Sequence, residues 1–146
     1  MVTEKKIDLA LGKQFPVKVI PLIQSAKKSI DIIVYDWRWY GDGNGSKVQE
    51  FNRAIVARAR AGVRVRALVN SDKIKSPLEP LGVKVKKCIS SKLLHTKLMI
   101  IDEEISILGS HNYTINAFFV NNEASVIIHD RETATKFSEY FSNLYN

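Results

Sequence analysis

His95 and Lys97 are the two residues whose types and spacing point most directly to chemistry. They stand two positions apart in residues 93–102, a segment dense in Leu and Ile and free of Gly and Pro, which predicts a strand. Alternate side chains of a strand share a face, so the imidazole and the ammonium are expected to lie side by side. An imidazole can attack phosphorus or carry a proton near neutral pH, and an ammonium stabilises oxygens that gain negative charge. The pair therefore predicts a site for an anionic ester.

Further polar groups follow after a predicted turn and a returning strand. Residues 102–104 are expected to form a tight turn, because Asp at a turn start can accept a hydrogen bond from the backbone just ahead of it. Residues 105–108 then read as the second strand of a hairpin. Ser110 and Asn112 close that strand, which brings a hydroxyl and an amide back towards the pair. Asp102 is expected to be structural, because it stands at the turn.

The full spacing, H-x-K-x-x-x-x-D, then six residues, then G-S-x-N, resembles the phospholipase D superfamily. The resemblance extends to residues 25–35, which are similar to the family's opening helix-to-strand passage, and to residues 121–128, which are similar to its following strand. It implies a catalytic set made of His95, Lys97, Ser110, Asn112 and Glu123, in which Glu123 orients the catalytic histidine. It also implies that Asp102 lies away from the phosphate.

The family's active site normally contains two copies of the His-x-Lys motif, whereas this sequence contains one. The resemblance therefore implies a homodimer with one site shared across its two-fold axis, as in the small bacterial nucleases of the superfamily. One His95 would form a phosphohistidine while the other protonates the leaving oxygen. No cofactor and no metal ion are expected. The empty site should attract phosphate or sulfate.

Aromatic and basic side chains follow the predicted strand at residues 30–35. Trp37, Arg38 and Trp39 are expected to bind substrate, because ligands gather at the C-terminal ends of strands in α/β folds. They would suit stacking on unpaired bases or insertion into a lipid interface, and structural packing is the alternative. His111, the variable position of G-S-x-N, is expected to be a loop residue near the same pocket.

The remaining pattern predicts an α/β fold, a layered sandwich with a central mixed β-sheet and helices on both faces. Further strands are predicted at residues 63–69, 83–89 and 123–128, and helices at 15–28, 47–61 and 131–144. Ser46 and Asp130 are expected to cap the second and third helices, and residues 41–45 to form a flexible turn. Strands alternating with helices indicate the layered fold, and the motif hairpin makes the sheet mixed. The family resemblance implies the helices on both faces.

Length and composition narrow the class of protein. The chain has 146 residues, 45% apolar and 25% charged, so we expect a single folded domain over residues 1–146. The single cysteine, Cys88, cannot form an internal disulfide, which favours a reducing compartment. The first eight residues lack a long apolar run, so we expect no signal peptide and no membrane anchor. We therefore expect a cytoplasmic location.

The net charge of +7 favours a polyanionic partner. The function predicted from the sequence is a metal-independent phosphodiesterase, with DNA or RNA as the first choice of substrate. The enzymatic alternative is hydrolysis of an anionic phospholipid such as cardiolipin. The alternative from another class is a nucleic-acid-binding module of a larger system.

Overall fold

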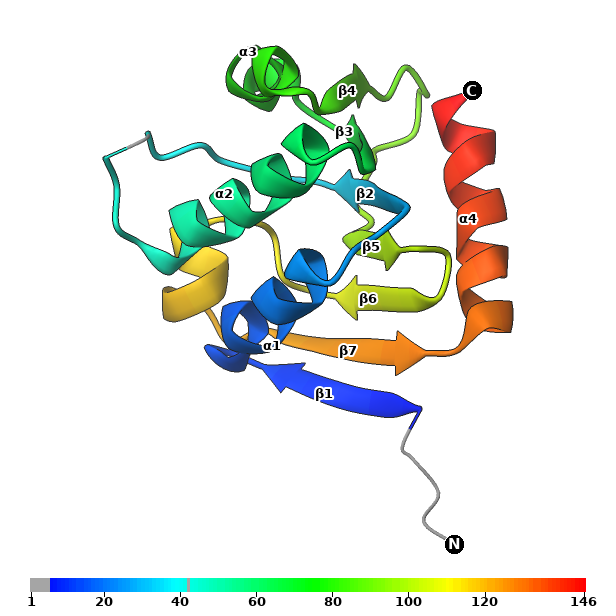
Figure 1. Cartoon of the computed structure of the whole chain (residues 1–146), viewed down its shortest axis with the longest axis horizontal. Helices are drawn as coiled ribbons and strands as arrows, with labels where there is room; N and C mark the ends of the chain where they lie inside the picture. Colours follow the sequence, from blue (N-terminus) through cyan, green and yellow to red (C-terminus); the bar gives the residue numbers. More distant parts are fainter. Residues whose placement is uncertain (1–5, 42) are drawn as a thin grey trace, which may run out of the picture.

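The computed structural model describes residues 6–41 and 43–146. Residues 1–5, which carry part of the expectation about a leader, and Asp42 of the expected turn lie outside the described residues. A seven-stranded sheet with the order β1-β7-β6-β5-β2-β3-β4 crosses the described part of the chain (Figure 1). Its strands are β1 (Ile7–Leu11), β2 (Ser29–Val34), β3 (Arg64–Val69), β4 (Lys84–Lys87), β5 (Leu98–Ile101), β6 (Ile105–Gly109) and β7 (Ala124–His129).

The sheet is mixed, as the sequence predicts. Strands β2, β3 and β4 are parallel, whereas β5, β6, β7 and β1 join the sheet through antiparallel pairs. The register pairs Leu98 with both Ile33 and Leu108, and Gly109 with Ser125. The C-terminal ends of β2 and β6 therefore meet the N-terminal ends of β5 and β7 at one end of the sheet. The segments that carry the predicted site residues adjoin that end.

Helices cover both faces of the sheet, which confirms the predicted architecture. The helical segments are α1 (Gln14–Gln24), α2 (Lys47–Arg60), α3 (Lys75–Leu78), α4 (Arg131–Tyr145) and the short turns η1 (Asp72–Ile74), η2 (Glu79–Leu81) and η3 (Asn116–Val120). Figure 1 shows α1 and α2 on one face and α4 on the other. Both predicted caps are present, because Ser46 Oγ accepts the Gln49 N–H at 3.2 Å and Asp130 Oδ2 accepts the Thr133 N–H at 3.0 Å.

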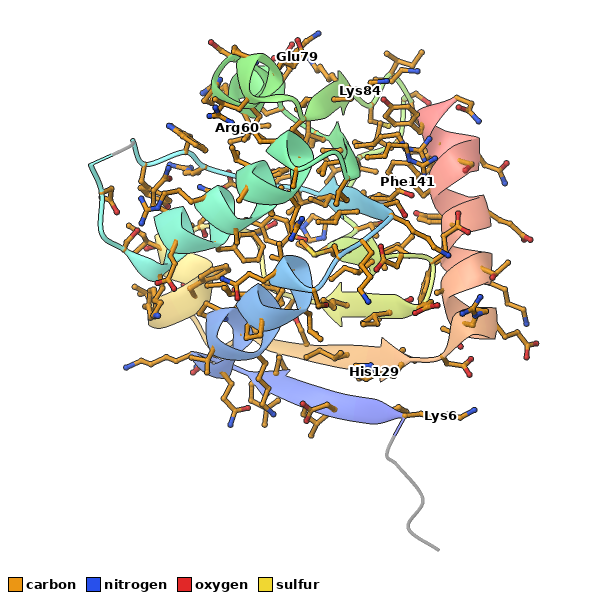
Figure 2. All side chains as sticks on the ribbon, in the orientation of Figure 1. Lys6, Arg60, Glu79, Lys84, His129 and Phe141 are labelled. Carbon is orange, nitrogen blue, oxygen red and sulfur yellow. The ribbon has the colours of Figure 1, made fainter. Side chains whose placement is uncertain are left out.

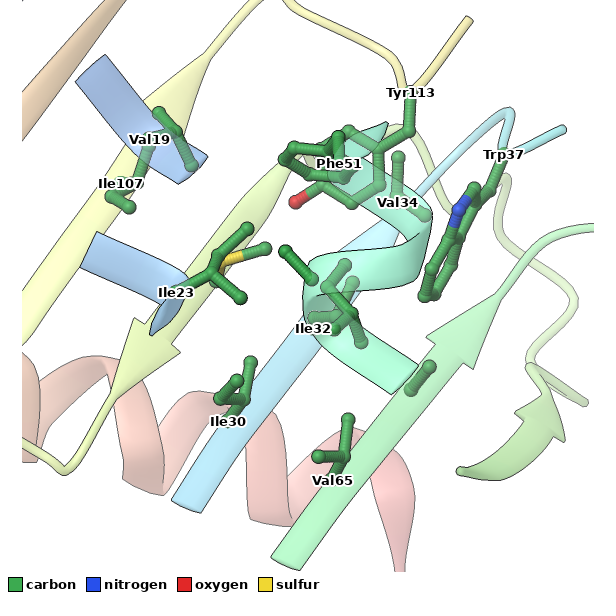
Figure 3. Close-up of a cluster of buried hydrophobic side chains, with 14 of the residues drawn as sticks. Val19, Ile23, Ile30, Ile32, Val34, Trp37, Phe51, Val65, Ile107 and Tyr113 are labelled. Carbon is green, nitrogen blue, oxygen red and sulfur yellow. The ribbon is translucent and has the colours of Figure 1, made fainter. Parts of the chain in front are cut away.

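Two hydrophobic clusters hold these layers together. The larger one joins α1 and α2 to the sheet, and Figure 3 shows Val19 beside Ile107, and Ile23 and Phe51 on the side of the strands that carries Ile30 and Ile32. The smaller one lies under α4, where Phe141 is fully buried against the residues that include Ile33 and Leu98, and Figure 2 labels it on the sheet side of α4. Because β2 and β5 contribute to both clusters, the central strands are rigidly fixed, and so is the end of the sheet that they form.

The structure corrects one element boundary that matters for the site. The predicted strand over residues 93–101 begins only at Leu98, so His95 and Lys97 lie in the segment that leads into β5. The reason is that the paired region of β2 ends at Ile33, opposite Leu98, which leaves the preceding residues without a strand partner on that side. The two side chains still lie together, at the end of the sheet where β5 begins, and His95 is exposed there.

Candidate active site

His95 and Lys97 are in contact at this end of the sheet. Lys97 Nζ lies 3.0 Å from His95 Nδ1 and 3.4 Å from His95 Nε2. Because an ammonium only donates, Lys97 is the donor in this contact and an imidazole nitrogen of His95 is the acceptor. The ring of Tyr35, the first residue after β2, lies beside both groups, 5.0 Å from the His95 ring and 5.8 Å from Lys97 Nζ.

Tyr35 is a site residue that the sequence interpretation missed. The sequence pattern predicts Tyr35 within the strand at residues 30–35, whereas β2 ends at Val34. Tyr35 is half-buried and packs beside the imidazole, so it restricts the positions that the His95 ring can adopt. Its place directly after a buried strand was the available signal, because residues at the C-terminal ends of strands commonly line ligand sites.

Lys97 lies in a partly desolvated position. Burial lowers the pKa of its ammonium, and the negative charge of Glu123 acts in the opposite direction without cancelling the effect. A cation that has already lost part of its water is stabilised more by an anion than a fully hydrated one is. The lowered pKa of Lys97 therefore fits a position prepared for a negatively charged group.

Ser110 is held next to Lys97 by the close approach of β6 and β7. The Gly109 N–H points to the Lys97 carbonyl at 3.4 Å, and a Cβ added to Gly109 would lie 2.3 Å from Ser125 Oγ, so only glycine fits there. The Ser110 hydroxyl accepts the Ala124 N–H at 3.0 Å and faces the Ala124 carbonyl at 3.3 Å. In this structure Ser110 thus fastens the start of β7, and contact with a phosphoryl oxygen stays a prediction.

Asn112 joins the β6 end to the segment after β2. Its Oδ1 accepts the Asp36 N–H at 3.1 Å. The Tyr113 N–H donates to the Asp36 carbonyl at 3.0 Å, and the Arg38 N–H donates to the Tyr113 carbonyl at 3.1 Å. Because its oxygen is held by the backbone, the amide of Asn112 has a fixed orientation, and its N–H₂ end remains as a donor for a ligand.

Glu123 does not have the hydrogen-bond partner that the family resemblance implies. Within the described residues its carboxylate accepts from Asn121 Nδ2 at 3.2 Å and makes no hydrogen bond to His95. Asn121 is only two residues away in the sequence, so this is a local hydrogen bond. The charge of Glu123 nevertheless reaches Lys97, where it favours the protonated ammonium. Within this chain Glu123 thus acts on Lys97 through its charge, and an orienting contact with a catalytic histidine stays a prediction.

His111 is a core residue, which corrects the expectation that it lines the pocket. It is 1% exposed and stacks on Phe15 at a centroid distance of 4.3 Å. Nδ1 lies 2.7 Å from Ser125 Oγ and Nε2 lies 2.9 Å from the Gly12 carbonyl, so Nε2 carries the proton and Nδ1 accepts from the hydroxyl. Burial lowers the pKa of His111, which keeps the ring neutral. Both nitrogens are used, so His111 has none left for substrate.

Trp37 is also in the core, whereas Arg38 and Trp39 are accessible. The Trp37 indole is 6% exposed, donates from Nε1 to Asn52 Oδ1 at 2.7 Å and meets Tyr113 edge-on at 5.5 Å. Figure 3 shows it beside α2 in the cluster of Phe51 and Tyr113. The expectation that the Trp37 ring stacks on a substrate is therefore wrong, because the ring packs inside the protein. Arg38 is exposed and Trp39 half-buried.

Asp102 lies at the opposite end of β5 from His95 and Lys97. Its carboxylate accepts hydrogen bonds from the backbone N–H groups of Lys27, Lys28 and Ser29 at 2.7–3.1 Å. Burial by itself would raise the pKa of Asp102, but these donors outweigh it and the pKa is lowered. The carboxylate thus ties the β5–β6 turn to the passage from α1 into β2 and takes no part in the site.

Asp102→Asn is expected to lower the free energy of unfolding by about 1–3 kcal/mol at pH 7, because hydrogen bonds to a charged acceptor are lost or weakened. Asn tolerates the positive φ of 55° found here, so the backbone strain does not change. The folded-state pKa is depressed, so the stabilisation is present above the ordinary carboxyl range near ~4 and disappears as the pH falls through the folded value. Denaturant unfolding of both proteins at pH 7 and pH 3 measures the difference.

Glu103→Gln is the matched control, because Glu103 occupies the same turn, is exposed and also has a positive φ. It should leave stability nearly unchanged. Equal losses in the two variants, or a loss in Asp102→Asn that persists at acid pH, would mean that the carboxylate does not fasten the turn as described.

No group of three His, Cys, Asp or Glu side chains among residues 6–41 and 43–146 is placed to hold a metal ion. No helix in the same ranges is long and apolar enough to cross a membrane.

The family model described as "Cardiolipin synthase, PLD-like domain" matches residues 19–145, which is most of the chain. Among curated proteins, mitochondrial cardiolipin hydrolase of Xenopus tropicalis is 25% identical over 134 residues, which cover 88% of this chain and 60% of that protein. The Xenopus laevis protein of the same name is 30% identical over 99 residues, covering 64% of this chain and 47% of that protein. The chain thus spans about half the length of these relatives.

Two solved bacterial structures share the fold over almost their whole length. NucT from Helicobacter pylori superposes with a TM-score of 0.78 at 24% identity, covering 96% of this chain and 95% of that one. The phospholipase D family member Nuc from Salmonella typhimurium gives 0.80 at 23% identity, with the same coverage. At this level of identity the likeness establishes the fold, and the chemistry has to be argued from the side chains.

Proposed function

The chain belongs to the phospholipase D superfamily, and from this membership we propose that it is a phosphodiesterase that hydrolyses nucleic acid without a metal ion. The observation that carries the proposal is the contact between Lys97 Nζ and the His95 ring at 3.0 Å, at an open end of the sheet. A neutral imidazole is a competent nucleophile, and the ammonium beside it can hold the oxygens of the phosphoryl group that it attacks.

The proposed reaction has two steps. A ring nitrogen of His95 attacks phosphorus, a P–N bond forms and the P–O bond to one half of the substrate breaks, while a protonated imidazole gives its proton to the leaving oxygen. That second imidazole, now neutral, takes a proton from water, which attacks phosphorus and breaks the P–N bond. Lys97, Asn112 and Ser110 are proposed to hold the phosphoryl oxygens throughout, with Lys97 supplying the positive charge.

The second imidazole cannot come from the same chain, and this supports a homodimer. The sequence has three histidines. His111 is buried with both nitrogens engaged, and His129 ends β7 at the far end of the sheet from the site, where Figure 2 labels it. A second copy of the chain, related by a two-fold axis through the site, would supply another His95 and another Lys97. Two lysines so arranged repel each other until an anion such as phosphate or sulfate binds between them.

Nucleic acid is the substrate that we propose first, because the chain carries a net charge of +7, which favours a polyanionic ligand. The second candidate is an anionic phospholipid, and what favours it is the printed name of the curated relatives, mitochondrial cardiolipin hydrolase. The two candidates share the same chemistry at phosphorus and differ in what surrounds the scissile bond.

The proposal predicts that phosphodiester hydrolysis survives an excess of EDTA, because His and Lys side chains replace the metal ion. The measurement is incubation of the purified protein with single-stranded DNA, RNA and cardiolipin vesicles, each with EDTA and with added Mg²⁺ or Zn²⁺. Cleavage of a nucleic acid at equal rates in all conditions is the expected result. Hydrolysis of cardiolipin alone would move the proposal to the second candidate. Activity that EDTA abolishes and a divalent ion restores would refute the proposed metal-independent mechanism of His95 and Lys97.

A further inference from the structure

An open cleft of about 760 Å³ lies between the segment that follows β2 and the segment that follows β3. Its volume falls within the range of small-molecule sites. The side chains that line it and carry the argument are Tyr35, Arg38, Trp39, Asn70, Ser71 and Lys73. Both segments leave the C-terminal ends of parallel strands, which is where ligands bind in open α/β sheets.

The wall formed by residues 35–40 is fixed by hydrogen bonds on its far side. Asn52 Nδ2 donates to the Arg38 carbonyl at 2.8 Å, and Gln49 Oε1 accepts the Tyr40 N–H at 2.9 Å. The Tyr40 hydroxyl in turn accepts the Ile115 N–H at 2.8 Å. Together with the buried Trp37, these bonds present Trp39 in a set position, so the aromatic wall is formed before a ligand arrives.

The opposite wall is polar and basic. Asn70 offers an amide, Ser71 a hydroxyl and Lys73 an ammonium, and the last two are exposed. Ile74, which is 2% exposed, anchors this segment in the core. The cleft thus has an aromatic side and a side with hydrogen-bond donors and a positive charge, as a ligand with a planar ring and a phosphate requires.

Tyr35 connects the cleft to the chemistry. It lines the cleft and also packs against His95 at 5.0 Å between ring centroids. The cleft and His95 thus share one side chain, Tyr35, as a common border. This places the cleft in position to bind what is attached to the scissile phosphate.

We propose that this cleft binds the base of the nucleotide next to the scissile phosphate, by stacking on Trp39 and by hydrogen bonds to Asn70 and Ser71. Lys73 contacts the phosphate that follows, whereas Arg38 is already paired with Asp36, which also lines the cleft, at 3.3 Å. The inference rests on the proposed nuclease function and adds to it a base-binding subsite, which makes single-stranded nucleic acid the substrate, since a paired base cannot enter the cleft. An acyl chain fits less well, because it would place Asn70 and Lys73 against hydrocarbon with no partner.

The test compares two probes with the same phosphate backbone, a thymidine hexanucleotide and an abasic chain of six tetrahydrofuran phosphates. Wild type should have a kcat/KM roughly 5- to 150-fold higher for the thymidine chain, since base–aromatic stacking is typically of that size. Trp39→Ala should remove this preference and Trp39→Phe should retain most of it. Lys73→Ala should weaken both probes, whereas Lys84→Ala should weaken neither. Lys84 is the matched control, because it begins edge strand β4, away from the cleft end.

Each outcome decides the proposal. An equal kcat/KM of wild type for the two probes, or a preference that persists in Trp39→Ala, overturns the subsite and leaves the nuclease function standing. If neither probe is cleaved, while DNA and RNA are not cleaved in the EDTA assay either, the nuclease function fails. Whenever neither probe is cleaved, the subsite is judged by the affinity of the two probes for wild type, measured by fluorescence anisotropy. Equal affinities overturn it, and a preference for thymidine that requires Trp39 supports it. A loss in Trp39→Ala confined to hydrolysis of cardiolipin vesicles overturns it in favour of lipid.

Discussion

His95→Ala is expected to lower the turnover of phosphodiester hydrolysis by at least about 10⁴-fold, the largest effect of any single substitution in this chain. Alanine removes the nucleophile and, in a symmetric dimer, also the general acid, which alone contributes about 10²- to 10⁴-fold. The side chain is exposed and contacts Lys97 and Tyr35, so its loss leaves no buried cavity. Initial rates on single-stranded DNA in EDTA measure the effect.

His129→Ala is the control for this experiment. His129 is exposed, ends β7 and lies at the other end of the sheet, so its replacement should leave turnover unchanged. Thermal unfolding of both variants shows whether the fold is retained. A well-folded His95→Ala protein with the turnover of wild type would refute the assignment of His95, whatever the identity of the substrate.

The second large effect concerns the dimer. In the proposed dimer, a hybrid of one wild-type chain and one His95→Ala chain would contain a single His95 in the shared site, so it would lack either the nucleophile or the acid. Its steady-state turnover should fall by about 10²-fold or more below that of the wild-type dimer. Two different affinity tags on the two chains allow the hybrid to be isolated after subunit exchange.

A wild-type dimer that carries both tags is the control for the exchange and should keep full activity. A hybrid that retains half of the wild-type turnover would mean that each chain has a complete site of its own. A fully active monomer in solution, detected by sedimentation at assay concentration, would contradict the shared site altogether.

The layered fold could be predicted from the sequence because its signals are local. Buried β2 and the amphipathic α2 and α4 have distinct periodicities, and Ser46 and Asp130 mark where helices begin. The edge strand β1 was not predicted. Its alternation runs opposite to the usual one, since Ile7, Leu9 and Leu11 are about half exposed while Ala10 is buried. A short strand whose large apolar side chains face outwards has no pattern that identifies it.

The contact between His95 and Lys97 could be predicted because the two residues stand only two positions apart in the sequence. The surroundings of the two residues could not be predicted, because they depend on contacts between segments far apart in the sequence. His111 and Trp37 have residue types that suit a ligand site, and only their partners Gly12, Ser125 and Asn52 show that they are structural. The cleft likewise needs the segment after β3 to meet the segment after β2, which are over thirty residues apart in sequence.

The most direct test of the central claim is to trap the covalent intermediate. The protein is mixed with excess single-stranded DNA in EDTA, denatured in alkali within the first turnover, digested and examined by mass spectrometry. We predict a phosphoryl-DNA adduct on the peptide that contains His95, and no adduct on any peptide when His95 is replaced by Ala. Rapid DNA cleavage by wild type with no adduct at His95, or with the adduct on another residue, would contradict the account.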